Sequence, residues 1–223
     1  MSDVLLKDQI LLVKNLLTAD QCDTLVNEYN NSKQKKTIDS YTHAFTDNVI
    51  QSTSQYIDLK PNTETFKIVH SATEILTNKW LTYLKQRNVA FCEFLKIHLK
   101  YAQHYRIVCF NTNEQLEPHI DSEDFTYATC ILNLNDNFKG GEHSFFNGNY
   151  NITLKKGSGL IFPTGWYWVH EIKKITSGNK LCIPILITRH PKNLNKQIQT
   201  KFFLLQSDIK YNHHLFYKSS EKI

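Results

Sequence analysis

The part of the chain from about residue 95 to residue 188 is a succession of short strand patterns with no helical pattern between them. Apolar and polar side chains alternate over 95–101, and apolar runs follow at 104–110, 126–134, 158–162 and 180–188. Turn-forming residues lie between these runs: Asn-Thr-Asn at 111–113, Lys-Gly-Gly at 139–141, Asn-Gly-Asn at 147–149 and Lys-Gly-Ser-Gly at 156–159. Such a series favours a β-sandwich or a barrel.

The residues before this part have a helical pattern. Thr18, with Gln21 three residues later, is a capping-box signature for a helix start. A second helix is predicted from about Thr63 to Arg87, because apolar residues recur near helical spacing at Phe66, Val69, Ile75, Trp80, Leu81 and Leu84. The polar stretch at 41–60 is predicted to be a loop. The expected fold class is therefore α+β, mainly β, with the helices first and the β core after them.

A length of 223 residues suits one domain with a well-buried core. Within it we expect a helical support region at 1–94 that is integral to the fold, and a β core at 95–190. The residues at 191–223 form a C-terminal extension of mixed, basic composition, to which the sequence assigns no role. No oligomeric state follows from the sequence.

The net charge of +5 is most simply explained by solubility. The basic clusters at 33–36 and 173–174 are short, whereas a nucleic-acid surface needs a dense basic patch, so nucleic acid is not the expected partner. The basic residues are mostly Lys, and Asn is abundant. This bias is typical of AT-rich genomes, such as those of large viruses.

Five cysteines without a Cys-x-x-Cys motif argue against a disulfide framework or a zinc knuckle and favour a reducing compartment. The N-terminus lacks the basic start and apolar run of a signal peptide, and no apolar stretch approaches membrane-spanning length. We therefore predict a soluble intracellular protein, cytoplasmic or otherwise, with no membrane partner.

A candidate metal site begins with Glu117-Pro-His119-Ile-Asp121. In a strand, residues two apart point to the same face, so His119 and Asp121 can direct an imidazole and a carboxylate at one ion. By itself this pair is a weak signal, since a hydrogen-bonded surface pair has the same spacing. His170 strengthens it, although a single His is more often a satisfied core residue. Two His and one carboxylate form the facial triad of non-haem iron sites, which leaves positions open for a co-substrate and O₂; manganese suits the same ligands.

Several motifs around these residues resemble the iron(II)/2-oxoglutarate dioxygenase superfamily, in its prolyl 4-hydroxylase-like branch. The order His119-x-Asp121, His170 and Lys180 is similar to the family's, and three neighbouring segments agree with it: Thr129-Cys-Ile-Leu-Asn-Leu-Asn135, Gly140-Gly-Glu142 and Lys155-Lys-Gly-Ser-Gly-Leu-Ile-Phe162. The resemblance covers most of 10–188. It implies a double-stranded β-helix, or jelly roll, braced by the N-terminal helices.

The resemblance also implies iron(II) held by His119, Asp121 and His170, with 2-oxoglutarate and O₂ as co-substrates and ascorbate as a candidate auxiliary reductant. Lys180 would pair with the distal carboxylate of 2-oxoglutarate. Thr129, Ile131 and Asn133 share one strand face and are expected to line the co-substrate site. Relatives often carry Tyr at the positions of Asn133 and Phe110; Asn133 can still donate through its amide, whereas Phe110 has no hydroxyl.

Asn113 and Leu116, near the metal motif, also depart from the family's pattern. These departures affect the prediction of the substrate and not that of the metal centre. The intact Asp121 predicts hydroxylation rather than halogenation. The first hypothesis is hydroxylation of a peptide or protein, with proline as the leading target. A free amino acid, a small metabolite or a nucleic-acid base is the alternative, and a non-catalytic binding module is the third. His143 is interpreted as structural or substrate-facing, and Trp166-Tyr-Trp168 as core or as a substrate-gripping lip.

Overall fold

The computed structural model describes residues 5–46, 48–87, 99–121, 126–188 and 203–204. The helices are the 3₁₀ helix η1 (Leu6–Gln9), α1 (Ala19–Asn31) and α2 (Glu64–Gln86). The strands are β1 (Leu11–Val13), β2 (Lys36–Thr37), β3 (Tyr41–Thr42), β4 (Val49–Ile50), β5 (Gln55–Asp58), β6 (Tyr101–Gln103), β7 (Arg106–Phe110), β8 (Leu116–His119), β9 (Thr126–Asn133), β10 (Lys139–Gly140), β11 (His143–Phe145), β12 (Tyr150–Ile152), β13 (Gly159–Pro163), β14 (His170–Ile172), β15 (Ile175–Ser177), β16 (Lys180–Thr188) and β17 (Phe203–Leu204).

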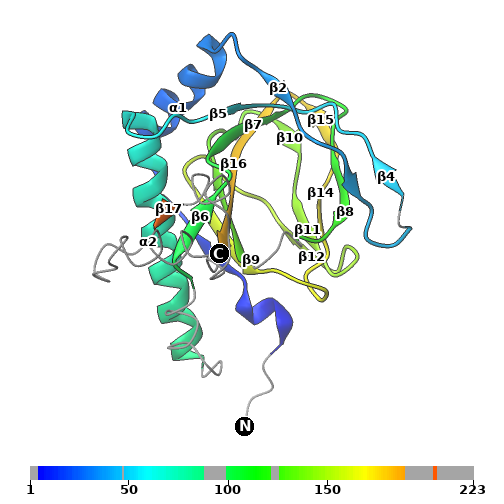
Figure 1. The fold of residues 1–223 in the computed structure, drawn as a ribbon. Coiled ribbons are helices and arrows are strands. Elements are labelled where there is room, and N and C mark those ends of the chain that lie inside the picture. The colour runs from blue at the N-terminus through cyan, green and yellow to red at the C-terminus, as the bar shows by residue number, and fades with distance from the viewer. Residues whose placement is uncertain (1–4, 47, 88–98, 122–125, 189–202, 205–223) are drawn as a thin grey trace, which may run out of the picture.

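Two antiparallel sheets form the walls of the barrel (Figure 1). The major sheet has the order β1-β13-β9-β16-β7-β5-β2, with β6 also paired to β16 and β17 to β6. The minor sheet has the order β12-β11-β14-β8. Neighbours such as β9 and β16 are distant in the sequence, as the crossing connections of a jelly roll require. The predicted double-stranded β-helix is confirmed.

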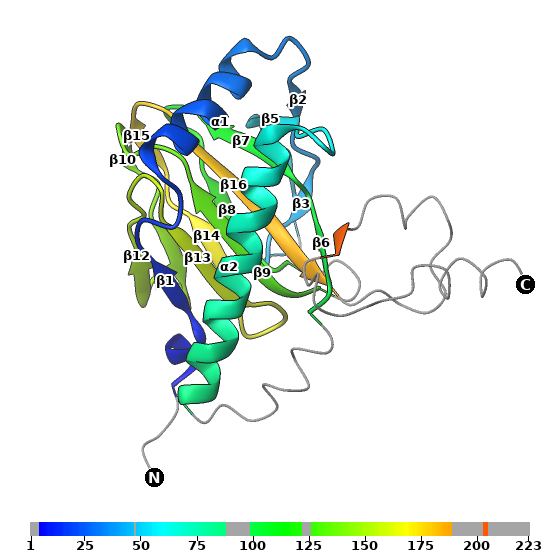
Figure 2. The same cartoon turned by 90° about the vertical axis from the view of Figure 1, so that its left-hand side faces the viewer.

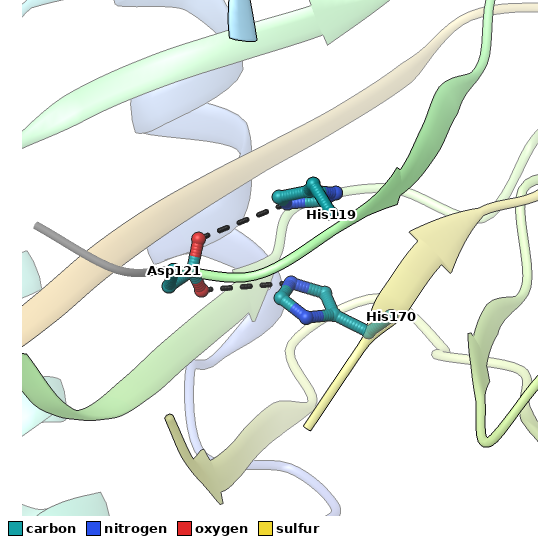
Figure 3. Close-up of side chains that lie close together, drawn as sticks. All are labelled: His119, Asp121 and His170. Carbon is teal, nitrogen blue, oxygen red and sulfur yellow. Dashed lines mark ion pairs between the residues drawn. The ribbon is translucent and has the colours of Figure 1, made fainter. Parts of the chain in front are cut away.

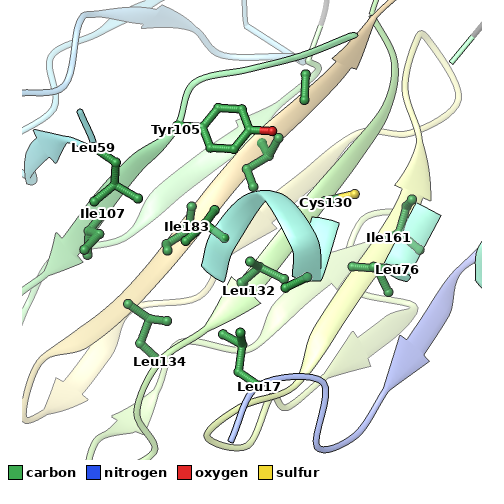
Figure 4. Packing of buried hydrophobic residues seen from close by; sticks show 14 of the residues in the cluster. Leu17, Leu59, Leu76, Tyr105, Ile107, Cys130, Leu132, Leu134, Ile161 and Ile183 are labelled. Carbon is green, nitrogen blue, oxygen red and sulfur yellow. The ribbon is translucent and has the colours of Figure 1, made fainter. Parts of the chain in front are cut away.

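Alternation of side chains gives the major sheet an outer and an inner apolar face. On β9, Cys130 and Leu132 belong to the outer cluster, which Figure 4 shows packed against Leu76 of α2. Ile131, between them in sequence, belongs to a separate inner cluster with Phe110. The sheet is thus buried on both faces, by helices outside and by the minor sheet inside.

The two helices cover the outer face of the major sheet (Figure 2). Thr18 caps α1 by accepting from the Gln21 backbone N–H, and the Gln21 side chain returns the bond, so the predicted capping box is confirmed. The predicted second helix is also confirmed as α2. Its expected core face is wrong at Ile75, which is 44% exposed, because one residue rotates the helix by about 100° and Leu76 takes the buried place.

The loop predicted at 41–60 is wrong, since the stretch contains the β3–β4 hairpin and β5. β5 pairs with β7 from Gln55↔Cys109 to Asp58↔Arg106, so backbone hydrogen bonding makes a strand where the side-chain pattern is polar. The predicted strand at 95–101 lies mostly outside the described residues. The same is true of the extension at 191–223, apart from β17. No helix in the described ranges combines the length and apolar character needed to cross a membrane.

Candidate metal centre and co-substrate site

Two neighbouring strands of the minor sheet bring His119 and His170 together. His119 ends β8, His170 opens β14, and the two are direct partners in the antiparallel register, so their side chains point to the same face. Their ring centroids are 4.3 Å apart. Asp121 follows the end of β8, so the expectation of one strand carrying both His119 and Asp121 is wrong, yet its carboxylate turns toward both rings (Figure 3).

The ligand atoms of the three residues lie within 4.8 Å of one another. His119 Nε2 is 3.7 Å from Asp121 Oδ1, and His170 Nε2 is 3.5 Å from Asp121 Oδ2. The other ring nitrogens, both Nδ1, lie 2.9 Å from Glu117 O and 3.0 Å from Trp168 O. A carbonyl oxygen can only accept, so each Nδ1 carries the proton and each Nε2 keeps a free lone pair for a metal.

The protonation states also favour a cation at this site. Burial lowers the pKa of His119 to about 4, and the neighbouring His170 acts in the same direction, so His119 is neutral at neutral pH. Burial alone would raise the pKa of Asp121, but His170, His119 and the hydrogen bond from Thr129 outweigh it and lower that pKa. A neutral imidazole and an ionised carboxylate are the forms that bind metal. The residues therefore fit a divalent ion.

Aromatic side chains hold the two histidines in place. Phe145 of β11 stacks on the His170 ring at 5.8 Å, and Phe162 of β13 meets the same ring edge-on at 4.8 Å. Tyr41 of β3 packs edge-on against His119 at 5.5 Å, and its hydroxyl accepts from the Glu117 backbone N–H at 2.8 Å. Tyr41 was missed from the sequence because its segment was interpreted as a loop.

The triad lines a cavity of about 660 Å³ inside the barrel. Of the other residues predicted for the site, Thr129 and Phe110 line the cavity as well. Thr129 Oγ1 donates to Asp121 Oδ2 at 2.5 Å, so its hydroxyl supports a candidate metal ligand. Phe110 contributes an apolar wall and is 2% exposed.

Asn133 is not one of the residues that line this cavity. Its side chain is fully buried, and Nδ2 donates to the backbone oxygens of Asn135, at 2.6 Å, and Leu154, at 3.3 Å. Its carbonyl oxygen has no hydrogen-bond partner among the described residues. The amide therefore ties the end of β9 to neighbouring backbone.

Lys180 is fully buried where β16 begins. Its Nζ donates to Gly141 O at 2.5 Å and lies 3.2 Å from His143 Nε2. No carboxylate of the described residues forms an ion pair with it, and burial lowers its pKa to about 8. Lys180 is not itself a cavity-lining residue, but His143 is.

His143 therefore stands between the cavity and a buried ammonium. Because Lys180 can only donate while charged, His143 Nε2 accepts and Nδ1 carries the proton, yet Nδ1 has no partner in the described structure. Burial, reinforced by Lys180, lowers the pKa of His143 well below its ordinary value. An unpaired donor beside an uncompensated cation fits a carboxylate ligand. The sequence signal was the position of His143 directly after Gly-Gly-Glu.

Comparison with known proteins agrees with this arrangement. Residues 102–187 match the family model described as the 2OG-Fe(II) oxygenase superfamily. No curated protein sequence matches the chain. A similar solved structure is the viral collagen prolyl hydroxylase vCPH from Paramecium Bursaria Chlorella virus-1, as a 2OG complex: it is 16% identical with a TM-score of 0.58, over 82% of this chain and 97% of that one.

Two further solved structures have the same fold. A prolyl-4-hydroxylase from Pseudomonas putida is 15% identical with a TM-score of 0.56, over 82% of this chain and 94% of that one. A prolyl hydroxylase from Trichoplax adhaerens, in complex with a hypoxia inducible factor oxygen degradation domain peptide fragment, is 14% identical with a TM-score of 0.57, over 82% and 84%.

Within the β core, residues 102–187 match the 2OG-Fe(II) oxygenase superfamily model, so the resemblance expected from the sequence is confirmed. Its fold is the one that the prolyl hydroxylase structures share. The superfamily uses iron(II), 2-oxoglutarate and O₂, and the His-Asp-His donor set suits that iron.

Proposed function

We propose that this chain is an iron(II)- and 2-oxoglutarate-dependent dioxygenase that hydroxylates a C–H bond of a peptide, with a prolyl residue as the first target. The observation that carries the proposal is the convergence of two free Nε2 atoms and one carboxylate on a single point of the cavity. Both rings are already oriented by their Nδ1 hydrogen bonds, so the donors are arranged before any ion binds.

His119, Asp121 and His170 would hold the iron. Three protein ligands leave positions for a chelating co-substrate and for O₂. With these bound, iron(II) supplies the oxidising chemistry: 2-oxoglutarate loses CO₂ to become succinate, one oxygen atom of O₂ enters succinate and the other enters the C–H bond. Phe145, Phe162 and Phe110 give the surroundings an apolar wall that limits water.

Thr129 offers a test of the metal centre that leaves all three ligands intact. Its hydroxyl holds Asp121 Oδ2, so Thr129→Val should weaken iron(II) binding by about 10- to 100-fold, the usual effect of removing a hydrogen bond to a metal ligand. Thr129→Ser keeps the hydroxyl and serves as the control. Anaerobic calorimetry measures both affinities, and equal affinity of Thr129→Val and wild type would show that this bond does not support the site.

We place the distal carboxylate of 2-oxoglutarate at the Lys180–His143 pair. Lys180 supplies a buried positive charge without an acidic partner among the described residues, and His143 supplies an unpaired N–H at the cavity wall. A carboxylate there would satisfy both groups at once. The two residues come from β16 and β11, so they connect opposite walls of the barrel.

A peptide substrate is supported by the cavity opening. Trp166, which lines the cavity, is 88% exposed, and the neighbouring Tyr167 is 76% exposed, whereas Trp168 is buried. Exposed aromatic side chains beside a cavity are typical of surfaces that hold extended chains. The Trichoplax adhaerens relative of the fold was solved with a peptide bound, which supports the same use here.

The proposal is tested with the full chain, iron(II), 2-oxoglutarate and O₂. We expect release of succinate without peptide, and faster release with a proline-containing peptide that gains the mass of one oxygen atom. Manganese(II) in place of iron should bind without turnover. Absence of both iron binding and succinate release would refute the dioxygenase assignment. Oxygen gain only in free amino acids, small metabolites or oligonucleotides would leave the enzyme class in place and refute the peptide substrate.

A further inference from the structure

A cationic side chain, Arg106, lines the cavity at the opposite end of β7 from Phe110. Arg106 opens this strand, and it shares the inner face with Val108 and Phe110 because side chains alternate. Its Nη2 lies 2.6 Å from His104 Nδ1, which must accept because a guanidinium only donates. The guanidinium carbon stacks 4.9 Å from the centre of the Tyr56 ring. Arg106 is thus held in a defined position.

The sheet register separates Arg106 from the Lys180–His143 pair. Phe110 is the partner of Lys180, and Val108 is the partner of Cys182. Arg106 is four residues before Phe110, which corresponds to roughly 13 Å along a strand. Two cationic side chains are therefore associated with the cavity: Arg106, which lines it, and Lys180, which lies behind the cavity-lining His143.

The metal triad belongs nearer to the Arg106 end. Thr129, which contacts Asp121, pairs with Leu186 on β16, six residues after Lys180. Extending the β7–β16 register places Arg106 level with Pro184, two residues from Leu186. In the order β9-β16-β7, Thr129 and Arg106 lie on opposite sides of β16, so Arg106 is displaced across the sheet from the triad. A substrate bound beside the metal on the β7 side would meet its guanidinium.

Arg106 has no acidic partner in the described part of the chain. Asp58, opposite it across the β5–β7 pair, is bound instead to Lys36 Nζ at 2.5 Å. Among the described residues, the guanidinium contacts the His104 imidazole and the Tyr56 ring. A half-buried guanidinium without a carboxylate partner among the described residues is well suited to bind a carboxylate in a bidentate manner.

We propose that Arg106, positioned by His104 and Tyr56, forms a subsite for a carboxylate of the primary substrate, so that the enzyme selects acidic peptides. The inference rests on the proposed function and deepens it, since it names an Asp or Glu near the hydroxylated residue. A nucleic-acid strand fits less well, because a phosphate backbone needs a row of cations, and Lys36, which interacts electrostatically with Arg106, is already paired with Asp58.

The test compares three peptide pools of equal length, each with a central proline flanked by Asp and Glu, by Asn and Gln, or by Lys and Arg. Binding is measured by fluorescence anisotropy to iron-loaded protein with 2-oxoglutarate under nitrogen, so that no turnover occurs. Wild type should bind the acidic pool about 10- to 100-fold more tightly than the amide pool, the usual range for a hydrogen-bonded charge pair. Arg106→Gln should abolish this preference, and Arg106→Lys should keep part of it.

Arg87→Gln is the matched control, because Arg87 lies at the end of α2, outside the cavity, and pairs with Asp8 at 3.6 Å. It should retain the full acidic preference. Equal binding of the three pools by wild type, tighter binding of a single-stranded oligonucleotide, or an unchanged preference in Arg106→Gln would overturn the inference.

The affinity for 2-oxoglutarate is measured on the same proteins and should change by less than about twofold in Arg106→Gln, well below the effect expected for a lost charge pair. A large loss would place Arg106 at the co-substrate and overturn the inference. If wild type binds neither iron nor 2-oxoglutarate, the proposed function itself fails; if it binds both without preferring acidic peptides, only this inference fails.

Discussion

Replacement of His170 by Ala is expected to remove iron(II) binding and, with it, the release of succinate. His170 provides one of three converging ligand atoms, and its ring is held on three sides by Phe145, Phe162 and the Trp168 carbonyl. No other His, Cys, Asp or Glu of the described residues joins the cluster, so none of these residues can take its place. The affinity should fall by more than about 100-fold, beyond what loss of a supporting hydrogen bond causes.

The matched control for this prediction is His70→Ala. His70 is a half-buried histidine of α2 that contacts Tyr105 and lies outside the cavity, so its loss should leave iron binding unchanged. Thermal unfolding of the metal-free proteins shows whether each variant still folds. A folded His170→Ala protein that keeps iron affinity and succinate release would exclude this residue from the metal centre.

The sequence was most informative where a local pattern has a single structural solution. The run at 180–188 is β16 with the same bounds, and the capping box at Thr18 begins α1 as expected. Side-chain parity on β9 correctly separated Ile131, inside the barrel, from Cys130 and Leu132, under the helices. In each case the information lies within a few residues of chain.

The alternation of side chains along a strand predicts which face of the sheet a residue lies on, but not whether the cavity extends as far as that residue. Asn133 illustrates this difference. It is on the same side of β9 as Thr129 and Ile131, but the cavity does not extend to it, and its amide binds backbone instead. The extent of a cavity depends on which strands cross below it. That information is distributed over the whole chain.

Contacts between residues that are distant in the sequence also could not be predicted from the sequence alone. His143 became a candidate only through Lys180, 37 residues away in the sequence, and Tyr41 only through His119 and Glu117. Both depend on strand pairings that the sequence alone does not specify. The three-residue strands β11 and β14, which carry His143 and His170, are too short to show a period of two with any certainty of register.

Replacement of Lys180 by Met should weaken 2-oxoglutarate binding while the protein still folds. Met has similar length and no charge, so it fills the space but leaves a carboxylate at His143 without its cation. The loss should be about 3 kcal/mol or more, which raises the Kd for 2-oxoglutarate by ~100-fold. Iron(II) binding should be unchanged, because the contacts of Lys180 in the described part of the chain include none of the triad residues. Calorimetry with each ligand separates the two effects.

The pH dependence of the same variant gives an independent check. Burial lowers the pKa of Lys180 from 10.5 to about 8 in the folded protein, so between these values the unfolded chain binds the additional proton. Stability of the metal-free wild type should therefore gain from this residue as the pH rises from about 8 to 10.5, and Lys180→Met should lack that gain. Other titrating groups are common to both proteins and cancel in the difference.

Binding of 2-oxoglutarate should have the opposite trend, because the co-substrate needs Lys180 in its charged form. The affinity of wild type is expected to fall as the pH rises above about 8, while that of Lys180→Met stays weak and flat. Lys180→Arg keeps its charge throughout this range and is the control for the pH effect. If Lys180→Met bound 2-oxoglutarate as tightly as wild type, the buried ammonium would be a structural feature of the β16 start, and the co-substrate would be anchored elsewhere in the cavity.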